Sequence, residues 1–383
     1  MKKIPYGGHL ITDEDISSVV KVLKSDFLTQ GPSVKLFEDS FADYVGSKFA
    51  IAVSNGTAAL HLCTLALGLK PGEKVITTPI TFVASANCVR YCGGEVEFVD
   101  IDPETYLIDL NKVEDLLKKD TKGIYKGIIP VDFAGRANNL EEVRKLANDY
   151  GLWIIEDACH SPGGYFNDSL GNIQKCGNGN FADLAIFSFH PVKHIAAGEG
   201  GMITTNNETL YKRILNLRTH GIQQDLTKRL KFDGPWYYEM QELGYNYRLT
   251  DIQAALGSSQ LNRAQFGIER RKEIAEKYRN AFIDKNFIYG QSGIVDGHAY
   301  HLYILEVKNR NELFKYLRDK DIFCQVHYIP AYRMPYYESN KDKKVFYSNS
   351  EKYYERCISL PIFPHLTIQE QDYVIKTICE FYE

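Results

Sequence analysis

The sequence lacks the features of a secreted, membrane-spanning or nucleic-acid-binding protein. Its eight cysteines form no Cys-x-x-Cys pair, and no apolar run approaches the roughly 18 to 20 residues of a membrane span. The N-terminal lysines precede no apolar stretch of secretory length. A formal net charge of -4 leaves no basic excess for a phosphate backbone. We therefore expect a soluble, cytoplasmic protein that binds neither membrane nor nucleic acid.

Two nucleotide-binding fingerprints are also missing, and the histidines give little support for a metal site. The chain has neither Gly-x-Gly-x-x-Gly nor Gly-x-x-x-x-Gly-Lys-Ser/Thr, which argues against a dinucleotide oxidoreductase and a nucleotide hydrolase. His190 and His194 have the spacing of two metal ligands on one helical face, but Pro191 and the nearby glycines disfavour a helix. His298 and His301 form a loose pair in a polar loop, where we expect surface positions. We therefore expect no metal.

Short β-rich runs alternate with amphipathic helical segments over much of the chain. The main expected strands are residues 74–78, 96–101, 127–133, 152–158, 182–189 and 201–206. This alternation predicts an α/β domain with a mainly parallel sheet. A long helical stretch follows from about residue 250, and then a second, smaller α/β unit with strands at 301–307 and 322–329. We therefore expect a large domain over residues 1–250 and a small one over 251–383.

Polar residues at strand ends are the first candidates for a ligand site, because ligands bind at the carboxyl ends of strands in open α/β sheets. In "SNGTAALHL", Gly56 and Thr57 open a helix whose unpaired amides suit an anion such as phosphate. A plain helix N-cap at Asn55 or Thr57 is the alternative. In "WIIEDACHS", the strand ends in Glu156 and Asp157. Either carboxylate suits a structural ion pair or a cationic ring nitrogen, and the pattern does not choose between them.

The third strand end lies in "ADLAIFSFHPVKHIAAGEGG", where Ser188 and His190 come close to Lys193. A lysine does covalent chemistry when desolvation or a nearby cation lowers its pKa towards neutrality. An ordinary solvated lysine is the alternative reading. Pyridoxal 5'-phosphate uses all three places together, because it needs a phosphate cradle, an acid at its ring nitrogen and a lysine for its aldehyde. We therefore expect this cofactor.

A series of ordered stretches extends this pattern along the chain. They are "LTQGPSVKLFEDSFADYVG", "AVSNGTAALHL", "TTPITFVASANCV", "VDFAG", "IIEDACHS", "FSFHPVKHIAAGEGGMITTN", "LRTHGI", "GYNYRLTDIQAALG", "VHYIP" and "SLPIFPHLT". Over nearly its full length the chain therefore resembles the DegT-type nucleotide-sugar aminotransferases, which are pyridoxal phosphate enzymes of fold type I. The resemblance implies a large domain with a mainly parallel mixed sheet, a smaller C-terminal α/β domain, and transfer of an amino group from L-glutamate to a keto-sugar.

The resemblance also implies roles for individual residues. Lys193 would be the catalytic residue that holds the cofactor's aldehyde and moves the proton, and Asp157 would bind the pyridine nitrogen. Gly56, Thr57 and Ser188 would hold the phosphate. The complete set of implied cofactor contacts is Gly56, Thr57, Phe82, Asp157, His160, Ser188, Asn246 and Arg248.

Four of these contacts need further comment. Phe82 would stack on the cofactor ring, with a core position as the alternative. His160 would lie beside the cofactor's phenolic oxygen, with helix capping as the alternative. Asn246 and Arg248 would reach into the neighbouring subunit and complete its phosphate cradle. The resemblance therefore implies a homodimer with shared active sites.

Three stretches indicate a subgroup of the family. "FHPVKHI", "PWYYEMQELGYNYRLTDIQAALG" and "VHYIPAYRMPYY" are most similar to members that aminate C4 of UDP-2-acetamido-2,6-dideoxy-β-L-arabino-hexos-4-ulose in pseudaminic acid biosynthesis. Candidates for contacts with the sugar or nucleotide are Tyr6, His327, Tyr328 and the Trp236–Tyr238 cluster. Each of them suits packing equally well.

Two departures bear on the choice of sugar. Ala196 and Ala197 stand where relatives often carry hydroxyl residues, and residues 165–183 form a longer connection that we expect at the rim of the site. The alternatives are a C4 aminotransferase for another nucleotide-linked 4-keto-6-deoxy sugar and a non-catalytic regulator that binds pyridoxal phosphate. A dehydratase of the same family would carry histidine in place of Lys193.

Overall fold

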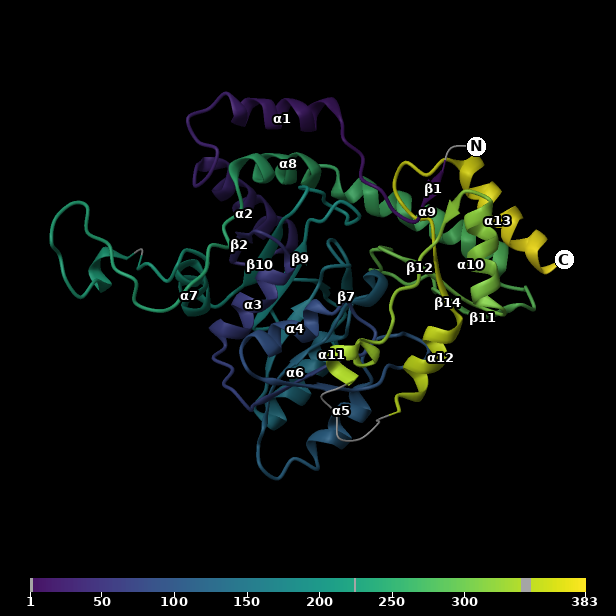
Figure 1. The fold of residues 1–383 in the computed structure, drawn as a ribbon, viewed down its shortest axis with the longest axis horizontal. Coiled ribbons are helices and arrows are strands. Elements are labelled where there is room, and N and C mark those ends of the chain that lie inside the picture. The colour runs from purple at the N-terminus through teal and green to yellow at the C-terminus, as the bar shows by residue number, and fades with distance from the viewer. Residues whose placement is uncertain (1–2, 224, 339–345) are drawn as a thin grey trace.

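The computed structural model describes residues 3–223, 225–338 and 346–383, and its centre is a seven-stranded sheet (Figure 1). In spatial order the strands are β2 (Phe49–Val53), β10 (Gly201–Thr205), β9 (Leu184–Ser188), β6 (Trp153–Asp157), β5 (Tyr125–Ile129), β3 (Lys74–Thr77) and β4 (Glu95–Phe98). Strand β10 runs antiparallel to both of its neighbours, and the other pairs are parallel. The mainly parallel sheet predicted from the sequence is therefore observed.

Helices cover both faces of this sheet, which is why its strands are apolar runs. On one face, α3 (Gly56–Ala66), α4 (Ala84–Tyr91) and α7 (Glu208–Arg218) pack over strand residues such as Ile155 and Leu184. The opposite face is covered by α2 (Pro32–Val45), α5 (Leu110–Leu117), α6 (Leu140–Tyr150) and α8 (Asp251–Leu261). Alternate side chains of each strand therefore enter different cores.

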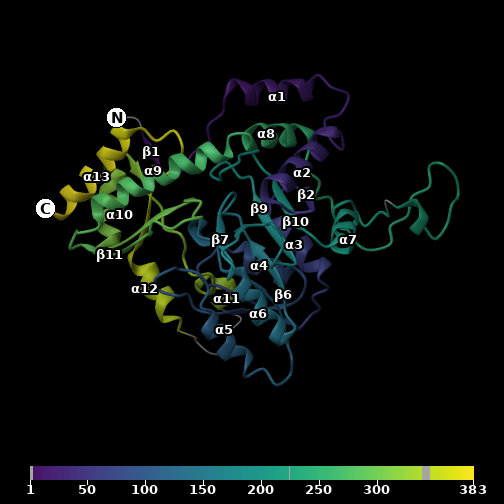
Figure 2. The same cartoon turned by 180° about the vertical axis from the view of Figure 1, so that it is seen from behind.

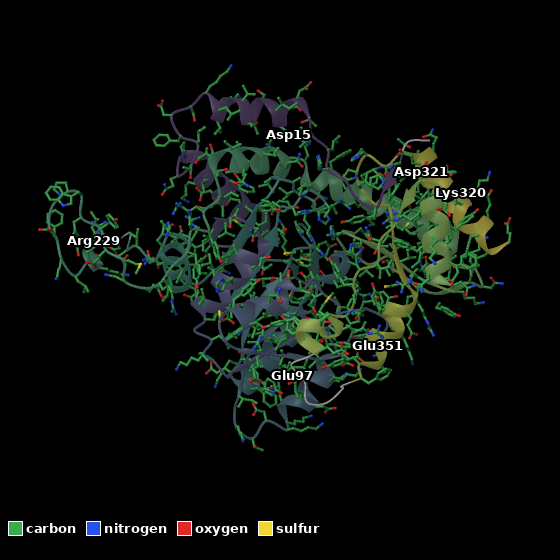
Figure 3. All side chains as sticks on the ribbon, in the orientation of Figure 1. Asp15, Glu97, Arg229, Lys320, Asp321 and Glu351 are labelled. Atoms are coloured by element: carbon green, nitrogen blue, oxygen red, sulfur yellow. The ribbon has the colours of Figure 1, made fainter. Side chains whose placement is uncertain are left out.

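The segment expected to be one long helix from residue 250 is divided in two. It forms α8 and then α9 (Ala264–Phe282), which leads towards the C-terminal unit in Figures 1 and 2. Asn262 and Arg263 lie between the two helices. Arg263 binds Asp15 of α1 (Asp13–Leu23) at 2.7 Å, and Figure 3 shows Asp15 between α1 and α8.

A smaller α/β unit is built on a three-stranded antiparallel sheet. Its order is β11 (Ile288–Gln291), β12 (Tyr303–Val307) and β14 (Cys357–Leu360), and it packs with α9, α10 (Arg310–Asp319) and α13 (Ile368–Tyr382). The N-terminal strand β1 (Ile4–Pro5) pairs with β13 (Ile322–Phe323), so the start of the chain joins this unit. The expected division near residue 250 stays a prediction.

The remaining elements are short, apart from α12. They are β7 (Tyr165–Asn167), β8 (Ile173–Lys175), α11 (Pro335–Glu338), α12 (Ser348–Arg356) and the 3-10 turns at Phe133–Gly135, Leu226–Lys228 and Ala331–Arg333. Strand β13 is shorter than the expected strand 322–329, because its pairing with β1 ends at Phe323 and Gln325 bridges to Ser359 of β14 instead. No helix within the described ranges is long and apolar enough to cross a lipid bilayer.

An extended arm leaves the body after α7. Residues 222–243, of which 224 is not described, project well beyond the sheet in Figures 1 and 2, and Figure 3 shows Arg229 on this arm. Its large apolar side chains are mostly exposed: Leu226, Leu230, Phe232, Trp236, Tyr238, Met240 and Leu243. Trp236 and Tyr238, considered above as sugar or nucleotide contacts, therefore lie on the arm.

Candidate active site

The carboxyl ends of β6 and β9 open into a cavity of about 740 Å³. Asn246, Arg248 and the Trp236–Tyr238 cluster do not line it. The lining includes all the other residues expected at the site, namely Tyr6, Gly56, Thr57, Phe82, Asp157, His160, Ser188, Lys193, His327 and Tyr328. These residues come from distant parts of the chain, and the sheet topology brings them together. The position matches the rule that ligands of open α/β sheets bind at strand ends.

The start of helix α3 forms one wall of the cavity. Asn55 is its N-cap and accepts a hydrogen bond from the amide of Ala58 at 2.8 Å. The amides of Gly56 and Thr57 have no acceptor among the described residues, and both residues line the cavity. A Cβ on Gly56 would lie 3.1 Å from Cβ of Ser188, so glycine permits this close packing. Free helix amides beside a serine hydroxyl suit a phosphate group.

Asp157 and Glu156 face opposite sides of the sheet, because side chains alternate along β6. Asp157 lines the cavity. Its Oδ2 accepts a hydrogen bond from Ser85 Oγ at 2.7 Å, and its Oδ1 accepts one from the amide of Cys159 at 3.2 Å. The carboxylate is therefore held in one orientation at the cavity wall. Of the two acids left open by the sequence, the structure brings Asp157 to the site.

Lys193 reaches the same cavity from the turn that follows β9. Its backbone amide bonds to His190 at 2.8 Å, which closes the turn. Burial lowers the pKa of the Lys193 amine below its ordinary value, while the nearby Cys159 and Asp157 oppose this effect. A larger fraction of the amine is therefore neutral than in a solvated lysine. The side chain thus has the property that covalent amine chemistry needs.

Aromatic side chains form the wall on the side of the small unit. The hydroxyl oxygen of Tyr328 and Nε2 of His160 share a hydrogen bond of 3.2 Å, and burial raises the pKa of Tyr328, which keeps this hydroxyl protonated. The ring of Tyr6 lies 5.1 Å from that of His327. Phe82 is 59% exposed and lines the cavity, so the core position considered as its alternative is wrong.

The remaining histidines occupy other places than the sequence suggested. Residues 190–194 form turns instead of a helix, and His190 is exposed while His194 bonds to the carbonyl of Ala299 at 2.8 Å. His298 and His301 are buried, contrary to the surface positions expected for them. The cause is a long-range contact, since the backbone of residues 299–302 is hydrogen-bonded to Ala134 and Gly135. The ring of His301 consequently lies 4.3 Å from that of His160.

Asn246 and Arg248 do not line the cavity of this chain. Arg248 bridges to Val53 of the outer strand β2, whereas Asn246 bridges to Thr219 after α7 and is exposed. The role expected for them in a neighbouring subunit stays a prediction.

The two departures from the usual family pattern also lie away from the cavity. Ala196 and Ala197 are buried and do not line it. Residues 165–183 contain the hairpin of β7 and β8, and none of them lines the cavity, so the rim position expected for this connection is not found in this chain.

A buried acid pair lies behind the site on the opposite face of the sheet. One side-chain oxygen each of Asp132 and Glu156 and the sulfur of Cys176 lie within 4.8 Å of one another. Ser161 Oγ donates to Asp132 at 2.6 Å, and the amide of Gly177 donates to Glu156 at 2.9 Å. Burial, and then the charge of Asp132, raise the pKa of Glu156, so both favour its neutral form.

Several cavity residues were not found from the sequence. Ser85 and Thr81 orient the Asp157 carboxylate, and their hydroxyls lie 2.8 Å apart. His61 and Tyr247, which bond to each other at 3.2 Å, line the outer part of the cavity. The block "TTPITFVASANCV" contains Thr81 and Ser85, but only the folded chain brings that block to Asp157.

Comparisons with known proteins decide the family. A model of the DegT/DnrJ/EryC1/StrS aminotransferase family matches residues 9–379. The chain belongs to this family. "Uncharacterized protein MJ1066" of Methanocaldococcus jannaschii is 40% identical over 377 residues, covering 96% of this chain and 95% of that protein. The "UDP-4-amino-4,6-dideoxy-N-acetyl-beta-L-altrosamine transaminase" of Campylobacter jejuni serotype O:23/36 is 36% identical over 388 residues, covering 99% of this chain and 98% of that protein.

Solved structures of the family have the same fold. PseC of Helicobacter pylori, described as an aminotransferase of pseudoaminic acid biosynthesis, has a TM-score of 0.87 at 30% identity and covers 99% of both chains. The PLP-form of the putative sugar aminotransferase Spr1654 from Streptococcus pneumoniae has a TM-score of 0.86 at 28% identity, covering 98% of this chain and 97% of that one. This DegT-family chain is therefore a sugar aminotransferase that uses pyridoxal phosphate, with the expected fold.

The site residues fit this cofactor on their own chemistry. Free helix amides and a hydroxyl are available for its phosphate, an oriented carboxylate for its ring nitrogen, and a buried lysine of lowered pKa for its aldehyde. The three groups meet in one cavity, which is the arrangement expected from the sequence.

Proposed function

We propose that this enzyme transfers an amino group from L-glutamate to C4 of a UDP-linked 4-keto-6-deoxy-N-acetylhexosamine. The proposed sugar is UDP-2-acetamido-2,6-dideoxy-β-L-arabino-hexos-4-ulose, and the proposed pathway is pseudaminic acid biosynthesis. The observation that supports the aminotransferase chemistry is one cavity that contains Lys193, Asp157 and the start of α3. The full-length similarity to the Campylobacter jejuni transaminase and to PseC supports the choice of sugar.

Each group in the cavity has a defined task in this proposal. Pyridoxal phosphate, when bound, supplies an electron sink for the carbon that loses its proton. The amides of Gly56 and Thr57, with Ser188, bind the phosphate. Asp157 keeps a proton on the ring nitrogen by its negative charge. Lys193 Nζ, whose pKa burial lowers, accepts a proton from the α-carbon of the donor as a general base and later delivers one to C4 of the sugar.

The proposed functional unit is a homodimer with shared active sites, in which Asn246 and Arg248 complete the phosphate cradle of the neighbouring subunit. The absence of both residues from their own cavity supports this proposal, as does the apolar surface of the arm, since large exposed apolar patches mark interaction sites. A cytoplasmic location is also proposed, and the eight free cysteines agree with a reducing compartment.

The test of the reaction is incubation of the enzyme with pyridoxal phosphate, L-glutamate and a set of UDP-4-keto-6-deoxy sugars. We expect the amino sugar from the L-arabino compound, detected by mass spectrometry. Turnover of a D-gluco-configured keto-sugar alone would reject the pseudaminic acid assignment and favour another C4 aminotransferase. Cofactor binding without turnover of glutamate or any sugar would favour a non-catalytic regulator.

The test of the shared site is a mixture of two inactive variants, Lys193→Ala and Arg248→Ala. In a mixed dimer, one cavity keeps its own Lys193 and receives an intact Arg248 from the other subunit. We expect activity to return to about a quarter of the wild-type value after subunit exchange, since half of the dimers are mixed and each has one complete site. No recovery would contradict sharing through Arg248.

A further inference from the structure

His327 lies on a segment that crosses from the small unit to the cavity and is fixed at both ends. Gln325 pairs with Ser359 of β14 through two backbone hydrogen bonds of 3.3 and 2.8 Å. Further on, the amide of Ala331 donates to the carbonyl of Pro79 at 2.9 Å. The backbone on either side of His327 is therefore held by both parts of the molecule.

The imidazole of His327 has its own anchors. Its Nδ1 lies 2.8 Å from Ser359 Oγ, and its backbone carbonyl accepts a hydrogen bond from Tyr353 OH at 2.6 Å. The ring packs between Tyr6 and Tyr328, with ring centroids 5.1 and 4.9 Å away. His327 is nevertheless among the residues that line the cavity. Nδ1 is thus occupied by Ser359, and Nε2 is the ring nitrogen left for a ligand.

The hydrogen-bond partners of Ser359 determine which nitrogen of the His327 ring carries the proton. Ser359 is fully buried, and among the described residues the only acceptor within reach of its hydroxyl proton is His327 Nδ1. A proton on Nδ1 would leave this hydroxyl proton buried without an acceptor, which is costly. Ser359 therefore donates to Nδ1, and the neutral ring carries its proton on Nε2.

The neutral state of the His327 ring determines which class of ligand it can bind best. Burial, reinforced by the charge of Lys193, lowers the pKa of His327 to about 3. The ring therefore offers a hydrogen-bond donor without a positive charge. A carboxylate gains most from a charged partner, whereas a carbonyl or hydroxyl oxygen of a sugar is well matched to a neutral N–H group.

We propose that Ser359 is a positioning residue that fixes His327 as its Nε2–H form, and that this N–H group donates to a carbonyl or hydroxyl oxygen of the keto-sugar. The sugar part of this proposal rests on the proposed function, while the position of the proton does not.

The kinetic test separates the two halves of the reaction. Ser359→Ala should leave the rate at which glutamate converts the bound cofactor within about twofold of wild type, and should raise KM for UDP-2-acetamido-2,6-dideoxy-β-L-arabino-hexos-4-ulose by about tenfold, as for one weakened hydrogen bond. Ser292→Ala is the matched control, because Ser292 is also buried in the small unit and its Oγ accepts from the amide of Ile304. Ser292→Ala should change neither the rate with glutamate nor the KM for the sugar. An equal loss in both halves, or an unchanged KM, would overturn the sugar contact.

Two histidine variants test the donor atom. His327→Gln places an amide N–H group near the position of Nε2 and should keep most of the sugar affinity, whereas His327→Leu should lose as much as Ser359→Ala or more. Equal sugar affinity in His327→Gln and His327→Leu would contradict the proposed hydrogen bond from Nε2 to the sugar.

Long-range ¹H–¹⁵N NMR of histidine-labelled protein shows which ring nitrogen of His327 carries the proton. The His327 signal is assigned by its loss in His327→Gln. We expect the proton on Nε2 in wild type and a mixture of the two forms in Ser359→Ala. A proton on Nδ1 in wild type would overturn the proposal. This measurement needs no substrate, so it gives the same answer if no UDP-sugar is turned over and the proposed function fails.

Discussion

Ser85 donates a hydrogen bond to Asp157 across the cavity wall, with Oγ and Oδ2 2.7 Å apart. Ser85 lies near the start of α4, while Asp157 ends β6, and both side chains are buried. The hydroxyl of Thr81 lies 2.8 Å from that of Ser85 and continues the chain of contacts. The acid at the cofactor site therefore has a fixed direction before any ligand binds.

Ser85→Ala should weaken the binding of pyridoxal phosphate by about tenfold, because the Asp157 carboxylate loses one of its two hydrogen bonds. The measurement is titration of the apoenzyme with cofactor, followed by visible absorbance. Thr81→Val removes only the more distant hydroxyl and should cause a smaller loss. A loss from Thr81→Val as large as that from Ser85→Ala would show that Ser85 does not act directly on Asp157.

Gly56→Ala should reduce cofactor affinity more than it reduces folding stability. The new Cβ would lie 3.1 Å from Cβ of Ser188 and 3.4 Å from Sγ of Cys159, so the start of α3 must shift away from Ser188, which is expected to hold the phosphate. A shift of this kind should weaken pyridoxal phosphate binding by about tenfold or more, as expected for the loss of a charge-assisted hydrogen bond.

The matched control for Gly56→Ala is Gly267→Ala in α9. There the new Cβ would meet only Pro364, at 3.6 Å, so neither affinity nor stability should fall. Thermal unfolding of the apoenzymes and cofactor titration give the two readouts. A Gly56→Ala protein that binds cofactor like wild type would contradict the phosphate site at α3.

Lys193→Ala should abolish the visible absorption band of lysine-bound pyridoxal phosphate and reduce aminotransfer by about 100- to 10,000-fold, the usual contribution of a general acid or base. Burial lowers the pKa of Lys193 below 10.5, so the neutral, reactive amine should form at a lower pH than in an ordinary lysine. The rate of cofactor attachment should therefore rise with pH and level off below 10.5. Lys145→Ala, at an exposed position of α6, should leave both the band and the rate unchanged.

The sequence predicted much of this arrangement, because apolar strands and the polar residues that follow them are local patterns. Strands β3, β6, β9 and β10 fall within the expected runs, and the polar residues at the ends of β6 and β9 line the cavity. The choice between Glu156 and Asp157 required the side of the sheet that each residue faces, which depends on the packing of helices far away in the chain.

Long-range contacts explain the features of the site that the sequence did not predict. Ser85 and Asp157 are 72 residues apart, and no pattern in either block indicates their hydrogen bond. His301 is buried because its backbone neighbours bond to residues 134 and 135, so a polar-looking loop becomes part of the wall behind the site. The serine in "SLPIFPHLT" is likewise an ordinary strand residue until β14 brings it to His327.

Glu156→Gln should make the enzyme more stable at neutral and alkaline pH and flatten the pH dependence of its unfolding. Burial, and then the charge of Asp132, raise the pKa of Glu156 above that of an unfolded glutamate. Its stabilising effect is therefore complete below the unfolded pKa of about 4.3. Above that pH the unfolded chain loses a proton that the folded chain keeps, so the free energy of unfolding falls by up to about 1.4 kcal/mol per pH unit until Glu156 ionises in the folded state.

Glutamine has no proton to lose in this range and can still accept the hydrogen bond from the amide of Gly177 that Glu156 accepts at 2.9 Å. Urea unfolding of wild type and Glu156→Gln from pH 5 to pH 8 measures the slope. Glu355→Gln, at an exposed position of α12, should keep the wild-type slope. Equal slopes in wild type and Glu156→Gln would mean that Glu156 is already ionised beside Asp132, and that the acid pair is stabilised by contacts other than a retained proton.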